Sequence, residues 1–177
     1  MMICKSLLAL VLATGLVRQQ QPVDQEYHLK AVFLFNFTQF VQWPPDAFAS
    51  DESPFVIGVL GKNPFGTYLS DVVSGEKVNG HPLNIVYFKN TDEVKGCHIL
   101  FIDKTELDAR PGTLATIKGK NILTVGDAPN FMQQGGMIRF FTRNNKIQLQ
   151  INIDAVKEAQ LDVSSKLLRL AEIFVAH

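Results

Sequence analysis

Short apolar runs that alternate with helical segments constrain the fold of this chain more than any other feature. The first run, 55–61, reads Phe-Val-Ile-Gly-Val-Leu-Gly, and such a continuous run indicates a strand buried on both faces of a parallel sheet. Helical segments predicted at 65–73 and 114–117 lie between runs, as expected for βαβ units. The three further runs are 83–88, 99–102 and 122–125.

The C-terminal part of the chain has a different pattern. Residues 137–143 and 146–153 flank Asn144-Asn145, and asparagine tolerates the positive φ of a two-residue hairpin turn. A closing helix is predicted from Ser164 or Ser165. Its expected core stripe is Leu167, Leu170, Ala171 and Phe174. The predicted fold is a single layered α/β domain, with a mostly parallel central sheet flanked by helices, an antiparallel C-terminal hairpin and a closing helix.

The segment before the first strand predicts a long helix. Asp24 is its expected N-cap, and Pro44-Pro45 stop it after Trp43. With successive residues 100° apart around the helix, one stripe along it is apolar except for one amide. Phe35 falls on the opposite, polar side, together with Gln39. The stripe consists of Leu29, Phe33, Asn36, Phe37 and Phe40.

These positions divide into structural residues and interface candidates. A buried amide must find hydrogen-bond partners, so Asn36 is expected to tie the helix to a neighbouring segment. Phe35 and Gln39 are the candidates for a partner interface, because one helix cannot bury both of its faces against one sheet. The alternative is that a neighbouring loop or the final helix covers Phe35. The expected structural residues are Asn36, Phe37, Phe40, Trp43 and Pro44.

The N-terminal residues predict export. Lys5 precedes an apolar run over 6–17, which then breaks into Arg18-Gln19-Gln20-Gln21. The run is too short to span a bilayer, which needs about 20 apolar residues, and it is typical of a secretory signal peptide. We therefore predict a signal peptide over 1–21, a single domain over 22–177 and no direct membrane insertion. An uncleaved anchor is the alternative.

The number of cysteines and the distribution of charges limit the possible partners. Removal of the signal peptide would leave Cys97 as the only cysteine, which excludes an intramolecular disulfide. In an oxidising compartment such a thiol is either buried or pairs between chains, so a homodimer stays open. The 17 basic and 17 acidic side chains form no basic cluster, which argues against a nucleic-acid partner.

Polar residues follow three of the predicted strands. Open α/β sheets bind ligands beyond the carboxyl ends of their strands. The segment 61–66 lacks the ending of a P-loop and the spacing of a dinucleotide fingerprint, so an ordinary turn and a small-ligand site both stay open. The residues that such a ligand site would use are Lys62, Asn63, Asp103 and Asp127.

Residues for catalysis or metal binding do not cluster along the chain. The four histidines are scattered without paired spacing, and no serine lies in a nucleophile elbow. Cys97 and His98 are neighbours on a predicted strand, so they point to opposite faces. We therefore expect no enzyme, no metal site and no cofactor.

Several blocks of the sequence resemble the YfiR family, in the family's order. The opening block combines Leu-Lys-Ala-Val-Phe-Leu-Phe-Asn-Phe at 29–37 with Phe-Val-Gln-Trp-Pro at 40–44. The later blocks are 59–66, 96–102, 135–138 and 164–170, so the resemblance covers nearly all of the predicted mature chain. In one departure, members often carry a cysteine at the position of Gly58 that could pair with Cys97. Glycine there puts redox control through that bridge in doubt.

The resemblance implies a periplasmic protein that restrains an inner-membrane diguanylate cyclase. Such a protein would lower cyclic-di-GMP signalling and biofilm formation, and an outer-membrane lipoprotein partner would sequester it and release the restraint. This first hypothesis expects exposed apolar residues. The alternative is a periplasmic binding protein for an anion or metabolite, which expects a concave pocket at the strand ends.

Overall fold

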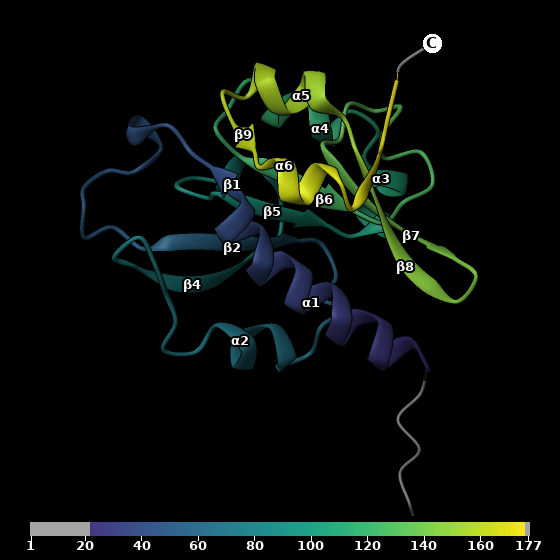
Figure 1. Ribbon diagram of the computed structural model, residues 1–177, viewed down its shortest axis with the longest axis horizontal. Helices are drawn as coiled ribbons and strands as arrows, with labels where there is room; N and C mark the ends of the chain where they lie inside the picture. The colour runs from purple at the N-terminus through teal and green to yellow at the C-terminus, as the bar shows by residue number, and fades with distance from the viewer. Residues whose placement is uncertain (1–21, 176–177) are drawn as a thin grey trace, which may run out of the picture.

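The computed structural model describes residues 22–175, and the predicted signal peptide lies outside this range. These residues form a single α/β domain in which helices cover both faces of one eight-stranded sheet (Figure 1). The strands of this sheet are β2 (Phe55–Leu60), β3 (Lys77–Val78), β4 (His81–Phe88), β5 (Ile99–Ile102), β6 (Leu123–Gly126), β7 (Ile138–Arg143), β8 (Lys146–Ile151) and β10 (Ala171–Ile173).

Helices and one small extra sheet complete the domain. The helices are α1 (Pro22–Phe40), α2 (Tyr68–Val73), α3 (Lys104–Ala109), α4 (Thr113–Ile117), α5 (Ile153–Glu158) and α6 (Ser165–Leu168), with 3₁₀ turns at Pro45–Ala47 and Thr91–Glu93. The extra sheet pairs β1 (Val41–Gln42) with β9 (Asp162–Val163) in antiparallel fashion.

The sheet is mostly parallel, as predicted. Its strand order is β10-β8-β7-β6-β5-β2-β4-β3, and β4, β2, β5, β6 and β7 run in the same direction. All residues of β2, β5 and β6 are buried, which explains their continuous apolar sequences. The strand order reverses between β2 and β5, so their carboxyl ends lie at the switch point of the sheet.

The predicted C-terminal hairpin is confirmed. Strand β8 pairs with β7 in antiparallel register, with Arg143 opposite Lys146. The two turn residues, Asn144 and Asn145, have φ angles of 51° and 59°. Both angles are positive, which is the conformation that favours asparagine in a two-residue turn.

The first helix differs from its prediction at both ends and in its buried face. Helix α1 includes Pro22, so Asp24 is not its N-cap, and it ends at Phe40 because the next two residues pair with β9. Leu29, placed on the predicted core stripe, is 48% exposed. Because apolar residues occur around most of this helix, its sequence periodicity was a poor guide to the face that the sheet covers. The buried positions are Lys30, Ala31, Leu34, Phe37 and Thr38.

The predicted closing helix is a single turn followed by a strand. Ser164 caps α6 by accepting a hydrogen bond from the backbone N–H of Leu167, as expected. The chain then extends as β10, parallel to β8, with Ala171 opposite Leu149. Leu170 is therefore 68% exposed rather than part of a core stripe. Backbone pairing to the edge of the sheet outweighed the helical pattern.

The buried side chains form two clusters. The larger one lies under α1 and α2 and is rich in aromatic residues, and the smaller one lies on the side of α3 and α4. Among residues 22–175, no helix combines the length and apolar character needed to cross a membrane.

Candidate functional site

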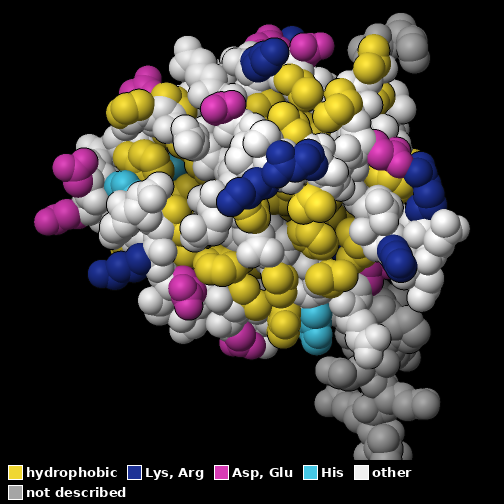
Figure 2. Space-filling model, in the orientation of Figure 1, with side chains coloured by type: hydrophobic (Ala, Val, Ile, Leu, Met, Phe, Trp, Pro, Cys, Tyr) yellow, Lys and Arg dark blue, Asp and Glu magenta, His cyan; other side chains and the backbone are white. Residues whose placement is uncertain are grey.

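The outer side of α1 carries apolar side chains that no further layer covers. Leu29 is 48% exposed, Val32 is half-buried one turn later, and Gln39 is exposed near the end of the helix. Figure 2 shows that hydrophobic side chains gather on the face that α1 crosses. Exposed apolar area that is contiguous on one face is typical of a contact surface for another protein.

A groove beside Leu29 continues this surface onto the β7–β8 hairpin. Its volume is about 490 Å³, and its apolar lining comes from Leu29, Phe33 and Ile147. Glu26 and Lys146 add charges of both signs to its lining. We call Leu29, Val32 and this groove the α1 surface.

Phe35 lies on the flank of α1 that faces α2. His28 stacks on Tyr68 of α2 with ring centroids 3.9 Å apart, and Phe35 lies two helical turns after His28. The ring of Phe35 is half-buried against the larger core cluster. Phe35 is thus a border residue of the α1 surface, whereas Gln39 is fully on its solvent side.

A buried charged cluster lies where the N-terminal half of α1 passes the carboxyl end of β6. The carboxylate of Asp127 accepts hydrogen bonds at Oδ2 from Lys30 Nζ (2.6 Å) and Tyr27 Oη (2.9 Å). Lys30 also pairs with Glu26 at 2.7 Å, and its ammonium group lies 4.3 Å from the centre of the Tyr27 ring. Burial, and then the charge of Asp127, raise the pKa of Tyr27 above its ordinary value.

The other predicted ligand residues take part in local structure. Asn63 accepts the backbone N–H of Phe65 and donates to the carbonyl of Gly66, which closes its own turn. Asp103 caps α3 by accepting the N–H of Thr105. Lys62 is exposed. The structure therefore leaves Asp127 as the predicted residue that lines a cavity here, together with Lys104 of α3.

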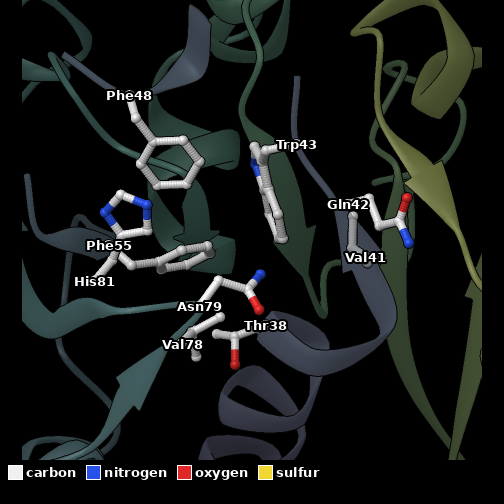
Figure 3. Close-up of a pocket in the computed structure, with 9 residues that line it drawn as sticks. All are labelled: Thr38, Val41, Gln42, Trp43, Phe48, Phe55, Val78, Asn79 and His81. Atoms are coloured by element: carbon white, nitrogen blue, oxygen red, sulfur yellow. The ribbon is translucent and has the colours of Figure 1, made fainter. Parts of the chain in front are cut away.

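An aromatic cluster occupies the opposite end of the sheet, where Trp43 follows α1 and β1. The indole of Trp43 contacts Phe55 edge to face at 4.8 Å, and the ring of His98 stacks on Phe48 and Phe55 at 4.4 and 4.7 Å. Figure 3 shows Trp43, Phe48 and Phe55 around a cavity of about 260 Å³. Its lining residues are Thr38, Val41, Gln42, Trp43, Phe48, Phe55, Val78, Asn79 and His81.

Hydrogen bonds fix the tautomer of His98. Its Nδ1 atom accepts the backbone N–H of Val56 at 3.0 Å, so the proton is on Nε2, which donates to the carbonyl of Ala47 at 3.2 Å. Burial lowers the pKa of His98 to about 4. The backbone carbonyl of His98 accepts both the Trp43 indole N–H and the N–H of Leu123. His98, which directly precedes β5, therefore joins the corner after α1 to the amino-terminal ends of β2 and β6.

A family model described as YfiR/HmsC-like matches residues 27–172. The chain belongs to the YfiR/HmsC-like family. The match begins at Tyr27 of α1 and ends at Glu172 of β10, so it includes the α1 surface, the charged cluster and the aromatic corner. A comparison with curated protein sequences gives no match.

The position at which this YfiR/HmsC-like chain departs from the expected cysteine pair is tightly packed. A Cβ atom added to Gly58 would lie 2.6 Å from the Phe88 ring, 2.8 Å from Cys97 Sγ and 2.9 Å from Leu100. Cys97 is a free, buried cysteine, and burial raises the pKa of its thiol to about 12. The thiol is therefore protonated and poorly reactive in the folded state.

The remaining structural candidates lie at or near the core. Phe37 is fully buried and stacks on Phe140 with centroids 6.0 Å apart. Asn36, Phe40 and Pro44 are half-buried, Phe40 packs against the larger core cluster, and Trp43 donates the hydrogen bond of this corner to His98. Within residues 22–175, no group of three His, Cys, Asp or Glu side chains could hold a metal ion.

Sequence reasoning missed Lys30, Tyr27 and His98. Lys30 is 3% exposed, although a lysine in an amphipathic segment is ordinarily assigned to the solvent. Its partner Asp127 is 97 residues away along the chain, so no local spacing connects them. The only signal was the strand-end rule, which indicated Asp127 but not the helix residues that cover it.

Proposed function

We propose that this YfiR/HmsC-like chain is a periplasmic regulatory protein that restrains an inner-membrane diguanylate cyclase by direct contact. Binding to the periplasmic part of the cyclase would lower cyclic-di-GMP production and biofilm formation. Family membership supports the class of function, and the exposed apolar residues of α1 support a mechanism based on protein contact.

The observation that carries the proposal is the α1 surface. A helix in a layered α/β domain ordinarily exposes polar residues, whereas α1 exposes Leu29 beside an apolar groove floored by Phe33 and Ile147. An apolar patch with a charged border matches the anatomy of transient protein interfaces. Glu26 and Lys146 supply the border.

The same surface would explain regulation by a second partner. An outer-membrane lipoprotein that covered the α1 surface would exclude the cyclase and so release the restraint. Self-association through this surface would have the same effect, because two copies would mask each other.

The test compares two exposed apolar residues in the native host. Leu29 and Tyr87 are 48% and 47% exposed, and Tyr87 lies on β4, outside the α1 surface, with its hydroxyl 3.2 Å from that of Ser70 on α2. Deletion of the gene should raise cyclic-di-GMP, and expression of the wild-type chain should lower it again. Leu29→Glu should fail to lower it, because a charge in an apolar contact costs binding energy. The control, Tyr87→Glu, should restore the wild-type level.

Three outcomes would contradict the proposal. Cyclic-di-GMP that does not change on deletion would exclude a restraint on a cyclase. Equal activity of Leu29→Glu and wild type, with both proteins at equal levels in the periplasmic fraction, would move the interface away from α1. N-terminal sequencing of envelope material that found an intact Met1 would contradict export with cleavage.

A further inference from the structure

A cavity of about 280 Å³ opens beside the buried charged cluster at the carboxyl end of the sheet. It lies between α1, the start of α3, the end of β6 and strand β7. Its volume corresponds to roughly nine water-sized volumes, which suits a metabolite of a few carbon atoms. Its lining residues are Glu26, Tyr27, Lys30, Lys104, Asp127, Phe140, Phe141 and Thr142.

Asp127 lines this cavity, and one oxygen of its carboxylate is buried without a donor among residues 22–175. The side chain of Asp127 is 8% exposed, and its Oδ2 atom already accepts Lys30 and Tyr27. Among the donors of residues 22–175, none reaches its Oδ1 atom. A buried carboxylate oxygen without a donor is costly, so a bound group that donates there would be favoured.

The charges of the cavity are arranged from negative inside to positive outside. Asp127, Glu26 and Lys30 together carry a net negative charge at the inner end. At the rim, Lys104 is exposed. Next to it, the ring of Phe141 lies 5.2 Å from the guanidinium of Arg139 and 5.0 Å from that of Arg143. Lys104 is thus the cation that lines the mouth of the cavity, whereas Arg139 donates to the carbonyl of Pro129 and Arg143 pairs with Glu172.

Phe140 and Phe141 add apolar area to the lining. We propose that this cavity binds a small zwitterion, whose ammonium group donates to Asp127 and whose carboxylate pairs with Lys104. An amine without a carboxylate would meet the positive rim uncompensated, and a carboxylate without an amine would meet Asp127 and Glu26. The cavity shares Glu26 and Thr142 with the groove of the α1 surface, but the inference does not depend on the proposed partner, because binding is measured on the purified protein alone.

The first experiment titrates purified protein with matched probes by calorimetry or by NMR. The zwitterions are glycine, β-alanine, γ-aminobutyrate and 5-aminovalerate, which vary only the separation of the two charges. The controls are n-butylamine and butyrate, each of which has one charge of γ-aminobutyrate. At least one zwitterion should bind saturably, about tenfold or more tightly than either control, as expected when one charge-assisted hydrogen bond is lost.

The second experiment compares a lysine that lines the cavity with one that does not. Lys104 and Lys62 are both exposed and follow neighbouring strands of the sheet, so Lys104→Gln and Lys62→Gln are a matched pair. Lys104→Gln should weaken the best zwitterion about fivefold or more, and Lys62→Gln should leave it unchanged. Asp127→Asn should abolish binding, but Lys104→Gln decides the test if that variant does not fold.

The proposal is overturned if no zwitterion binds below about 20 mM, an affinity too weak for even one charge-assisted contact. It is also overturned if n-butylamine or butyrate binds as tightly as the zwitterion of the same length, or if the two lysine variants behave alike. If the wild-type chain binds a zwitterion but deletion of its gene leaves cyclic-di-GMP unchanged, the proposed function is contradicted and this site stands.

Discussion

The two ends of the parallel sheet are joined to the same helix, but through opposite chemistry. At the carboxyl end α1 contributes Tyr27 and Lys30 to a charged cluster, and one oxygen of Asp127 there lacks a donor among residues 22–175. At the amino end the corner after α1 contributes Trp43 to an aromatic cluster in which both nitrogens and the carbonyl of His98 are bonded.

The difference supports the proposal that the carboxyl end receives a ligand, whereas the amino end holds the fold. A fully bonded aromatic corner gains stability from packing and needs no further partner. A buried carboxylate with a free oxygen is stabilised incompletely by its own chain, so its energy depends on what else binds. This division agrees with the general rule that parallel sheets bind ligands at their carboxyl ends.

The largest effect is expected from Lys30→Met at the carboxyl end. The change leaves Asp127 buried without its cation, so the free energy of unfolding should fall by about 3–5 kcal/mol. Urea unfolding of the purified protein measures this. Glu26→Gln is the control and should cost about 0–1 kcal/mol, because the Glu26 side chain is 39% exposed. Equal costs for the two variants would show that the pair with Asp127 does not dominate.

The next effect is a loss of stability in acid that His98 causes at the amino end. The pKa of His98 is about 4 in the folded state and about 6.5 when unfolded, so the unfolded chain binds a proton first as the pH falls. Above about pH 6.5 the free energy of unfolding keeps its full value. Between about pH 6.5 and 4 it falls because of His98, by up to about 3 kcal/mol.

Urea unfolding at pH 7.0, 5.5 and 4.0 measures this loss. His98→Gln, which cannot titrate in this range, is the control and should lose less stability over the same interval. If the variant and the wild type lose the same amount, then other groups cause the acid sensitivity and the histidine is not held neutral by burial.

A smaller effect is expected between the two ends, at Gly58 in β2. Gly58→Ala should cost about 1–3 kcal/mol, because its Cβ would lie 2.6 Å from the Phe88 ring and 2.8 Å from Cys97 Sγ. Denaturant midpoints measure it. The double variant Gly58→Ala, Cys97→Ala should lose less stability than the sum of the two single variants, since Cys97→Ala removes one of the close atoms. Full additivity of the two changes would place the conflict at Phe88 or Leu100 instead.

The smallest effect is expected from Trp43→Phe in the aromatic corner. The substitution removes the indole N–H that donates to the carbonyl of His98, but that carbonyl keeps its bond from Leu123. The expected cost is therefore about 1 kcal/mol, the net value of one hydrogen bond. Thermal and urea unfolding would measure it, and a cost above about 3 kcal/mol would mean that ring packing rather than the hydrogen bond secures this corner.

The strands and the hairpin were predictable because each is encoded by neighbouring residues. Continuous apolar runs marked β2, β5 and β6, and Asn144-Asn145 marked the turn. Strand β10 was not predictable, because its extended form depends on pairing with β8. A segment that reads as helix in isolation becomes a strand when a sheet edge supplies its backbone hydrogen bonds.

The candidate sites were predictable only in part, for the same physical reason. The sequence by itself determined the layered α/β class, the order of its strands along the chain and the presence of Asp127 after a strand. The tertiary structure decided that α1 exposes Leu29 and buries Lys30, and that Lys30 meets Asp127 across 97 residues. A helix with apolar residues on most sides has no single preferred face, so only the surrounding sheet and helices select the one that is buried.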